Sequence, residues 1–260
     1  MILIENAKVV TENGIIFDGA ILTDGDRIVK VGKRTELEVP KDVEIIDAEG
    51  LYVGPGFVDI HVHGGDGYMF YENPQKAAEH FLSHGETTVL ATLYTSLKKN
   101  EFEKAVTDIK EESVKGSISN VKGFYMEGPY MNPEFGCDAK NNTWLGEIKE
   151  EDYKTLIELA GNLAYVWSVA PEREGIAEFM ECAKNANPNT TFAVGHSKAT
   201  PEEIEKLKKF NVKIQTHCMN ATGRVGDSGG IRGVGPDEYC MQTTDMYAEQ
   251  IGRASCRERV

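Results

Sequence analysis

The sequence predicts an α/β protein, with a small β domain over residues 1–51 followed by an incomplete (β/α)8 barrel over residues 52–250. Two observations lead to this prediction. Short apolar segments separated by Asn-Gly and Asp-Gly pairs fill the first part of the chain. From Gly54 onward, extended apolar segments alternate with amphipathic helical ones. Such alternation is typical of parallel strands connected by helices.

The N-terminal domain is predicted to consist of hairpins. The pairs Asn13-Gly14, Asp18-Gly19 and Asp24-Gly25 supply the positive φ angles that tight hairpin turns require. The strands expected around these turns are Ile2–Ile4, Gly14–Phe17, Ala20–Leu22 and Ile28–Val31. A sheet of this size buries little apolar surface by itself, so we expect it to need a further layer.

The barrel segment is predicted to contain about six strand–helix units. The expected strands are residues 56–61, 87–93, 121–126, 164–169, 191–194 and 212–216. The expected helices are residues 74–83, 100–112, 151–160, 176–186 and 201–210. The last helix has Pro201 in its first turn, and Glu202 and Glu203 near its positive end. A closed barrel needs eight units, so two units are expected to be missing. Residues 245–250 are expected to begin a helix or a loop.

The composition excludes several classes of function. The chain has 28 Lys and Arg residues against 42 Asp and Glu residues, which gives a formal net charge of -14. So acidic a chain repels nucleic acid and anionic membranes. No apolar run reaches the roughly 18 residues that a membrane span needs. The N-terminus shows no secretory signal, and the five cysteines form no CxxC pair. We therefore expect a cytoplasmic protein that binds neither nucleic acid nor membranes.

The last ten residues, 251–260, differ from the rest of the chain. Arg253, Arg257 and Arg259 lie within seven residues of an otherwise acidic protein. One choice of codons for the sequence IGRASCRERV reads like a common sequencing-library adapter. We predict that this segment is an artefact and exclude it from the fold. The alternative is a genuine basic C-terminal tail.

Metal-ligating side chains fall where the predicted strands end. Four of the six histidines and one glutamate are at these positions, namely His61, His63, His196, His217 and Glu127. The carboxyl ends of barrel strands meet at one mouth, so these side chains are expected to converge. Imidazole nitrogens and carboxylate oxygens are ligands that divalent transition metals prefer. The sequence therefore predicts a site for one or two ions of Zn, Fe or Mn.

The motifs around these residues resemble those of the N-acetylglucosamine-6-phosphate deacetylase family of the amidohydrolase superfamily. Residues 48–65, AEGLYVGPGFVDIHVHGG, are similar to the beginning of an amidohydrolase barrel, and Met126–Pro133 resembles the strand-three motif of the deacetylases. Gly195–Ser197 and Thr216–Ala221 are similar to the next two metal-ligand motifs. Other amidohydrolases carry a carboxylated lysine on strand four. Residues 168–171 contain no lysine, so Glu127 would bridge instead.

The resemblance implies metal-dependent hydrolysis of the acetamide of N-acetylglucosamine 6-phosphate, which gives glucosamine 6-phosphate and acetate in amino-sugar catabolism. Glu127, His196 and His217 would hold one metal, and His61 and His63 a second, with Glu127 shared. It also implies a homodimer at full length and a β-sandwich completed by a C-terminal segment. The family's catalytic Asp ends strand eight, which this C-terminally truncated chain does not contain. No catalytic residue is therefore assigned, and we expect the 260-residue chain to be inactive.

The resemblance also implies substrate-binding residues. Asn220 and Ala221 match the phosphate-binding segment of the family, with Arg224 or Arg232 as the accompanying arginine. Asp138 stands where family members have a substrate-contacting histidine, so the substrate could be another acetylated sugar. Two further alternatives stay open. The chain could be an amidohydrolase that opens a cyclic amide, or a fragment that binds metal without catalysis.

Overall fold

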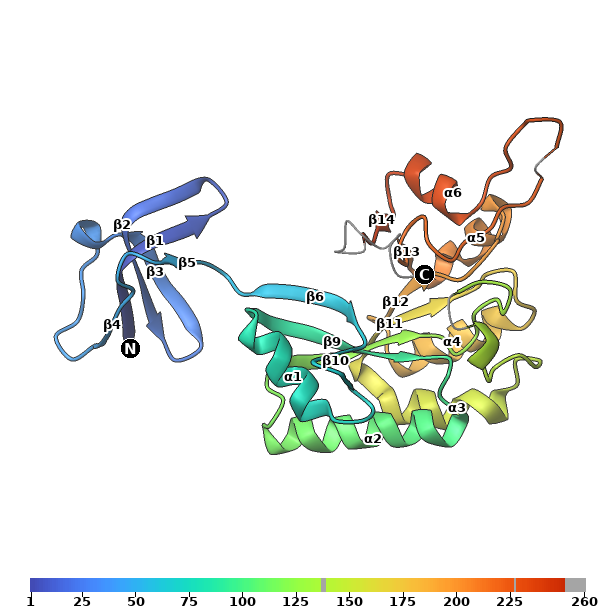
Figure 1. The fold of residues 1–260 in the computed structure, drawn as a ribbon, viewed down its shortest axis with the longest axis horizontal. Helices are drawn as coiled ribbons and strands as arrows, with labels where there is room; N and C mark the ends of the chain where they lie inside the picture. The colour runs from blue at the N-terminus through green and yellow to red at the C-terminus, as the bar shows by residue number, and fades with distance from the viewer. Residues whose placement is uncertain (137–138, 227, 251–260) are drawn as a thin grey trace. The chain divides into compact units, whose positions relative to one another are not determined.

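The computed structural model describes residues 1–136, 139–226 and 228–250. It divides the chain into two compact units, Met1–Phe57 and Val58–Val260 (Figure 1). The division comes later than the boundary after residue 51 that the sequence analysis expects, because strand β5 (Tyr52–Val53) pairs in parallel with the first strand of the chain. The expected artefact at residues 251–260 lies outside the described residues.

The first unit is a five-stranded sheet in the order β3-β2-β1-β4, with β5 also paired to β1. Its longer strands are β1 (Ile2–Thr11), β2 (Gly14–Asp24), β3 (Arg27–Lys33) and β4 (Glu44–Asp47), and a 3-10 turn, η1, covers Arg34–Glu36. The pairs β1–β2 and β2–β3 are antiparallel hairpins. Their turns contain Gly14 and Gly25 at positive φ, as the sequence predicts.

The turn predicted at Asp18-Gly19 is wrong, because both residues lie inside β2. The pairing of β1 with β2 shifts register between Ala7 and Val9, opposite Gly19, and Asp18 has a φ of 52°. A Cβ at Gly19 would lie 2.7 Å from a methyl carbon of Val9. The Asp-Gly pair therefore forms a bulge in one long strand instead of a turn between two.

The second unit contains a seven-stranded sheet in the order β14-β13-β12-β11-β10-β9-β6. Its strands are β6 (Phe57–Val62), β9 (Glu86–Tyr94), β10 (Val121–Glu127), β11 (Ala164–Val169), β12 (Thr191–Val194), β13 (Val212–Gln215) and β14 (Tyr247–Ala248). The pairs from β9 through β14 are parallel. The sheet curls into part of a barrel, which confirms the predicted fold class and all six predicted strands (Figure 1).

Helices cover the outer face of this sheet (Figure 1). They are α1 (Pro74–Ser83), α2 (Lys99–Lys115), α3 (Glu150–Ala160), α4 (Ile176–Ala186), α5 (Pro201–Leu207) and α6 (Pro236–Gln242). Shorter elements are the hairpin β7 (Gly64–Gly65) with β8 (Tyr68–Met69), and 3-10 turns η2 (Ala139–Asn141), η3 (Gly161–Leu163) and η4 (Lys208–Phe210). None of the helices in the described part of the chain has the length and apolar character of a membrane span.

Alternating side chains of the strands serve two separate cores. In β11, Trp167 packs outward into the large core under the helices, which includes Phe102 and Phe179. Its neighbour Val166 points to the opposite face and joins a smaller cluster with Leu90, Tyr125, Ala193 and Ile214. This period of two is what a strand requires. Strands β9 to β13 each contribute buried side chains to both clusters, so the ends of these five strands are well fixed, whereas the side chains of β6 and β14 are exposed or half-buried.

Candidate metal centre

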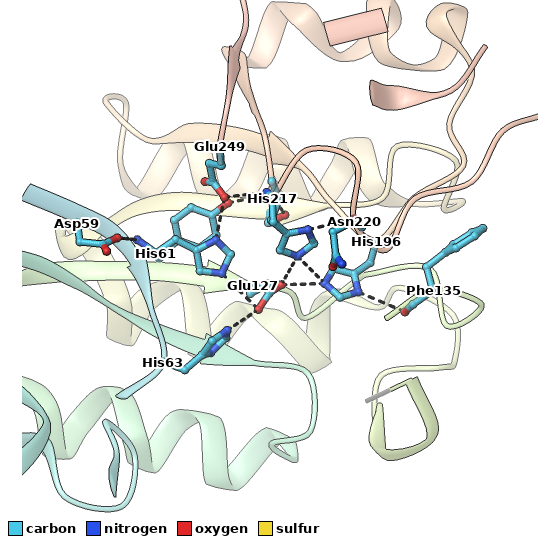
Figure 2. Close-up of polar contacts among 12 residues, drawn as sticks. Asp59, His61, His63, Glu127, Phe135, His196, His217, Asn220 and Glu249 are labelled. Atoms are coloured by element: carbon cyan, nitrogen blue, oxygen red, sulfur yellow. Dashed lines mark hydrogen bonds and ion pairs between the residues drawn. The ribbon is translucent and has the colours of Figure 1, made fainter. Parts of the chain in front are cut away.

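The structure brings together the five side chains predicted as metal ligands (Figure 2). Glu127, the last residue of β10, lies between the four histidines. Its Oε1 is 2.8 Å from His196 Nε2 and 3.0 Å from His217 Nε2. Its Oε2 is 3.0 Å from His63 Nε2 and 3.5 Å from His61 Nε2. Two three-residue groups therefore share one carboxylate, with one oxygen assigned to each group.

The charge of Glu127 is strongly stabilised by its neighbours. The residue is 2% exposed, and burial by itself raises the pKa of its carboxyl. Hydrogen bonds from the four histidines outweigh that effect and hold the pKa well below its ordinary value. Burial likewise lowers the pKa of His61, but its bonds to Glu127 and Glu249 raise it to about 10. The pocket thus favours positive charge beside a buried carboxylate.

Hydrogen bonds on the far side of each ring determine which nitrogen faces Glu127. His196 Nδ1 is 3.2 Å from the carbonyl oxygen of Phe135, and His217 Nδ1 is 3.1 Å from that of Asn220. A carbonyl can only accept, so each Nδ1 carries the proton. Nε2 of His196 and Nε2 of His217 therefore both face Glu127 Oε1 and lie 3.0 Å from each other, where the two nitrogens and the carboxylate oxygen could bind one ion together. This arrangement of acceptors fits a divalent cation.

The histidines that follow β12 and β13 lie on backbone that is not extended. His196 has a φ of 45° and His217 a φ of 28°, in the region that non-glycine residues rarely adopt. The backbone N–H of Asn132 helps to hold His196 in this conformation, because it donates to the carbonyl oxygen of His196 over 2.9 Å. A Cβ at Gly136 would lie 2.5 Å from His196 Nδ1, so only glycine lets the loop approach this ring.

Glu172 fixes the loops beside His196, and the sequence analysis does not identify it. Its carboxylate accepts from the Asn132 side chain at 2.8 Å, the Ser197 hydroxyl at 2.6 Å and the Lys198 backbone N–H at 2.9 Å. One side chain therefore connects the loops that follow β10 and β12. Its position three residues past the end of β11 is the sequence signal that could have pointed to it, because carboxylates at strand ends gather at the barrel mouth.

Glu249 is a second carboxylate that the sequence analysis does not identify. It directly follows β14, and its Oε2 lies 2.8 Å from His61 Nδ1 (Figure 2). A cavity of about 780 Å³ opens beside it, between β6 and β14. The residues that line this cavity include His61, His63 and His217.

The residues predicted to bind substrate are less clearly grouped. Asn220 is exposed, and its carbonyl oxygen is engaged by His217 Nδ1. Ala221 follows with a φ of 54°. The Nε of Arg224 is 3.0 Å from Glu238 Oε1 on α6, and Arg232 is exposed in the same loop. Asp138 lies outside the described residues.

Comparison of the sequence with known proteins gives consistent matches. A sequence model of the amidohydrolase family matches residues 52–246. An N-acetylglucosamine-6-phosphate deacetylase of Caenorhabditis elegans is 31% identical over 193 residues, which are 69% of this chain and 45% of that protein. The enzyme of the same name from Bacillus subtilis is 26% identical over 85% of this chain and 56% of its own. A Streptococcus thermophilus dihydroorotase is 28% identical over 86% of this chain and 49% of its own. The chain thus spans about half the length of these relatives.

Solved structures share the fold. An N-acetyl-D-glucosamine-6-phosphate deacetylase from Mycobacterium smegmatis superposes with a TM-score of 0.78 at 23% identity, covering 96% of this chain and 68% of that one. At this identity the likeness concerns the fold. An N-acetylglucosamine-6-phosphate deacetylase from Thermotoga maritima superposes with a TM-score of 0.71 at 25% identity, covering 96% of this chain and 62% of that one.

Proposed function

The chain belongs to the amidohydrolase family, and we propose that its metal centre serves the hydrolysis of the acetamide of N-acetylglucosamine 6-phosphate to glucosamine 6-phosphate and acetate. The observation that carries this proposal is the single carboxylate, Glu127, shared by two pairs of histidines. The names of the relatives from Caenorhabditis elegans and Bacillus subtilis support the choice of substrate.

The residues of the chain would act mainly by holding and orienting. Glu127, His196 and His217 would hold one divalent ion, and His61 and His63 a second with Glu127 shared. A bound Zn, Fe or Mn ion supplies Lewis acidity to polarise a carbonyl and lowers the pKa of water. The outward bonds of the Nδ1 atoms keep each ring facing inward. We assign backbone N–H groups near Asn220 and Ala221 to the sugar phosphate, with Arg224, Arg232 and Asp138 as further candidates.

The main alternative is the opening of a cyclic amide. The dihydroorotase relative favours it, because it matches this chain over 235 residues. The absence of lysine from residues 168–171 counts against it. Near the end of β11, the first of these residues is Ser168, which is fully buried and whose hydroxyl is 2.6 Å from that of Thr216. A different N-acetylated sugar is a further alternative, because Asp138 replaces a histidine of the family.

The proposal also covers the catalytic activity of this chain, its assembly and its location. No residue is assigned the role of the proton-transferring acid and base, so we propose that the 260-residue chain binds metal but does not turn substrate over. In that case the chain would be a fragment that binds metal without catalysis. A homodimer and a cytoplasmic location are likewise proposed.

The test compares ligands on the metal-loaded chain. Wild type and Glu127→Gln are loaded with Zn²⁺, their metal content is measured, and thermal stability and acetate release are followed with N-acetylglucosamine 6-phosphate, N-acetylgalactosamine 6-phosphate and dihydroorotate. We expect metal in wild type only, with stabilisation by N-acetylglucosamine 6-phosphate and no acetate. Acetate release would support the reaction and refute inactivity. Stronger stabilisation by dihydroorotate would refute the deacetylase assignment, and a metal-free wild type would refute the metal centre.

A further inference from the structure

Glu249, which directly follows strand β14, contacts two of the residues expected to bind metal. Glu249 Oε2 is 2.8 Å from His61 Nδ1 and 3.0 Å from the backbone nitrogen of His217 (Figure 2). The Glu249 side chain is 12% exposed. Its backbone is fixed by β13, because its N–H donates to the carbonyl of Gln215 and its own carbonyl accepts from Cys218, each over 2.9 Å. The position of this carboxylate is therefore set by the sheet.

The two contacts determine the tautomer of His61. The backbone N–H of His217 can only donate, so Glu249 Oε2 acts as an acceptor there. An ionised carboxylate has no proton to give, and so His61 Nδ1 must donate to the same oxygen. The proton of a neutral His61 is thereby held on Nδ1. Its Nε2 is left with a free lone pair on the side that faces Glu127 Oε2 at 3.5 Å.

The orientation of the His61 ring is restrained as well. The ring stacks on the ring of Tyr125, with centroids 4.2 Å apart and an interplanar angle of 18°. Tyr125 is itself fully buried, and its hydroxyl is 2.9 Å from that of Thr216. His63 is less restrained, because its side chain is 40% exposed against 13% for His61. The geometry of the His61–His63–Glu127 group therefore depends largely on how His61 is held.

We infer that Glu249 is a positioning residue that prepares the His61–His63–Glu127 group to bind a divalent cation. It holds the His61 lone pair toward the cation, and through His217 it ties this group to the neighbouring Glu127–His196–His217 group. We assign it a positioning role, because its Oε2 is occupied by His61 Nδ1 and by a main-chain N–H. The inference rests on the metal centre of the proposed function and does not depend on which substrate is hydrolysed.

The experiment is a Zn²⁺ titration of the full chain against a competing chelator, with wild type and four variants. His63→Ala identifies the binding event that belongs to the His61–His63–Glu127 group. Glu249→Ala should weaken that event about 10- to 100-fold, the usual cost of removing a residue that orients a metal ligand, and weaken the other event less. Glu249→Gln keeps an acceptor facing both donors and should lose less. Glu181→Gln, an exposed residue of α4, removes the same charge as a control.

A second readout reports on His61 directly. Nitrogen NMR of Zn²⁺-loaded, histidine-labelled protein should show His61 protonated on Nδ1, with Nε2 as the metal-bound nitrogen, in wild type and in Glu249→Gln. In Glu249→Ala we expect a mixture of tautomers or the Nε2 form. A residue that only stabilised the fold would not produce this change. If circular dichroism shows that Glu249→Ala does not fold, the test rests on the Zn²⁺ affinity of Glu249→Gln and on the tautomer of His61 in wild type. A wild-type His61 protonated on Nε2 overturns the inference.

The possible failures are distinguishable. A wild type that binds no Zn²⁺ would refute the proposed metal centre. If wild type binds Zn²⁺ and His63→Ala changes nothing, the His61–His63–Glu127 group holds no ion and the inference is overturned. Unchanged affinity and tautomer in Glu249→Ala overturn it directly. Equal weakening by Glu181→Gln would assign the effect to net charge and overturn it as well.

Discussion

At the scale of single residues, the five side chains of the candidate metal centre follow from a simple rule. Each lies at the carboxyl end of a strand that the sequence itself predicts, so their convergence could be expected before the structure. Glu249 and Glu172 were not identified. The first follows a strand of only two residues, and the second acts through hydrogen bonds to loops distant in sequence. Arg224 pairs with Glu238, a contact that no sequence motif indicates.

Gly136 provides a test of how tightly the centre is built. Gly136→Ala would place a Cβ 2.5 Å from His196 Nδ1, at a φ of 111° that L side chains rarely adopt. We expect His196 to be displaced and Zn²⁺ affinity to fall about 10- to 100-fold, as when a ligand's surroundings are disturbed. A chelator-competition titration measures this. Gly146→Ala is the matched control, since its Cβ would meet no atom within 4 Å and its φ is not positive. Equal affinity of the two variants would contradict the expectation.

At the scale of elements, the sequence predicts the strands and helices that carry a clear period. All six expected strands of the barrel are present, and the expected helix 201–210 appears as α5 continued by η4. The expectation of a helix or loop at residues 245–250 is wrong in part, because Tyr247 and Ala248 form β14. Two residues show no alternation, and their strand exists only through parallel pairing with β13. Helix α6 was not expected either.

The loops after β10 and β12 are predicted to depend on Glu172. Glu172→Ala leaves the hydroxyl of Ser197 and the N–H of Lys198 without their acceptor. We expect a loss of about 1–3 kcal/mol in the free energy of unfolding, the usual cost of a donor left without a partner. Urea unfolding measures it, with Glu174→Ala, an exposed neighbour, as control. If both variants unfold at the same urea concentration, the role assigned to Glu172 is wrong.

The segment that leads into β14 should be sensitive to acid. Hydrogen bonds from Lys208 and Thr243 lower the pKa of Asp245 to about 2, from an ordinary value of 3.8. A carboxyl with a depressed pKa contributes its full stability above the ordinary pKa and loses it as the pH falls toward the folded one. We therefore expect wild type to exceed Asp245→Asn in melting temperature equally at pH 7 and pH 5, and by less at pH 3. A difference that grows on acidification would contradict this assignment.

At the scale of the whole molecule, the sequence predicts a β domain over residues 1–51 and a barrel over residues 52–250, and the contacts within the structure group the chain into Met1–Phe57 and Val58–Val260. The later boundary could not be read from the sequence, because Tyr52 and Val53 join the first unit only through pairing with β1. The six strand–helix units of the sequence become seven strands, because β14 is too short to predict. The number of strands was thus the least predictable global feature, whereas the class of fold was the most predictable.

Metal binding should stabilise one unit and not the other. The five expected ligands come from β6, β10 and the segments after β6, β12 and β13, all within Val58–Val260. A ligand that binds only the folded state at 100 times its Kd adds about 2.7 kcal/mol to the free energy of unfolding. Hydrogen exchange with and without Zn²⁺ should therefore show slower exchange in peptides covering residues 58–63, 121–127, 191–197 and 212–217. Peptides from β1 and β2 should not change, because no expected ligand lies there. Equal protection of both units would show that metal stabilises the whole chain as one cooperative body, and no protection anywhere would argue against a metal centre at Glu127.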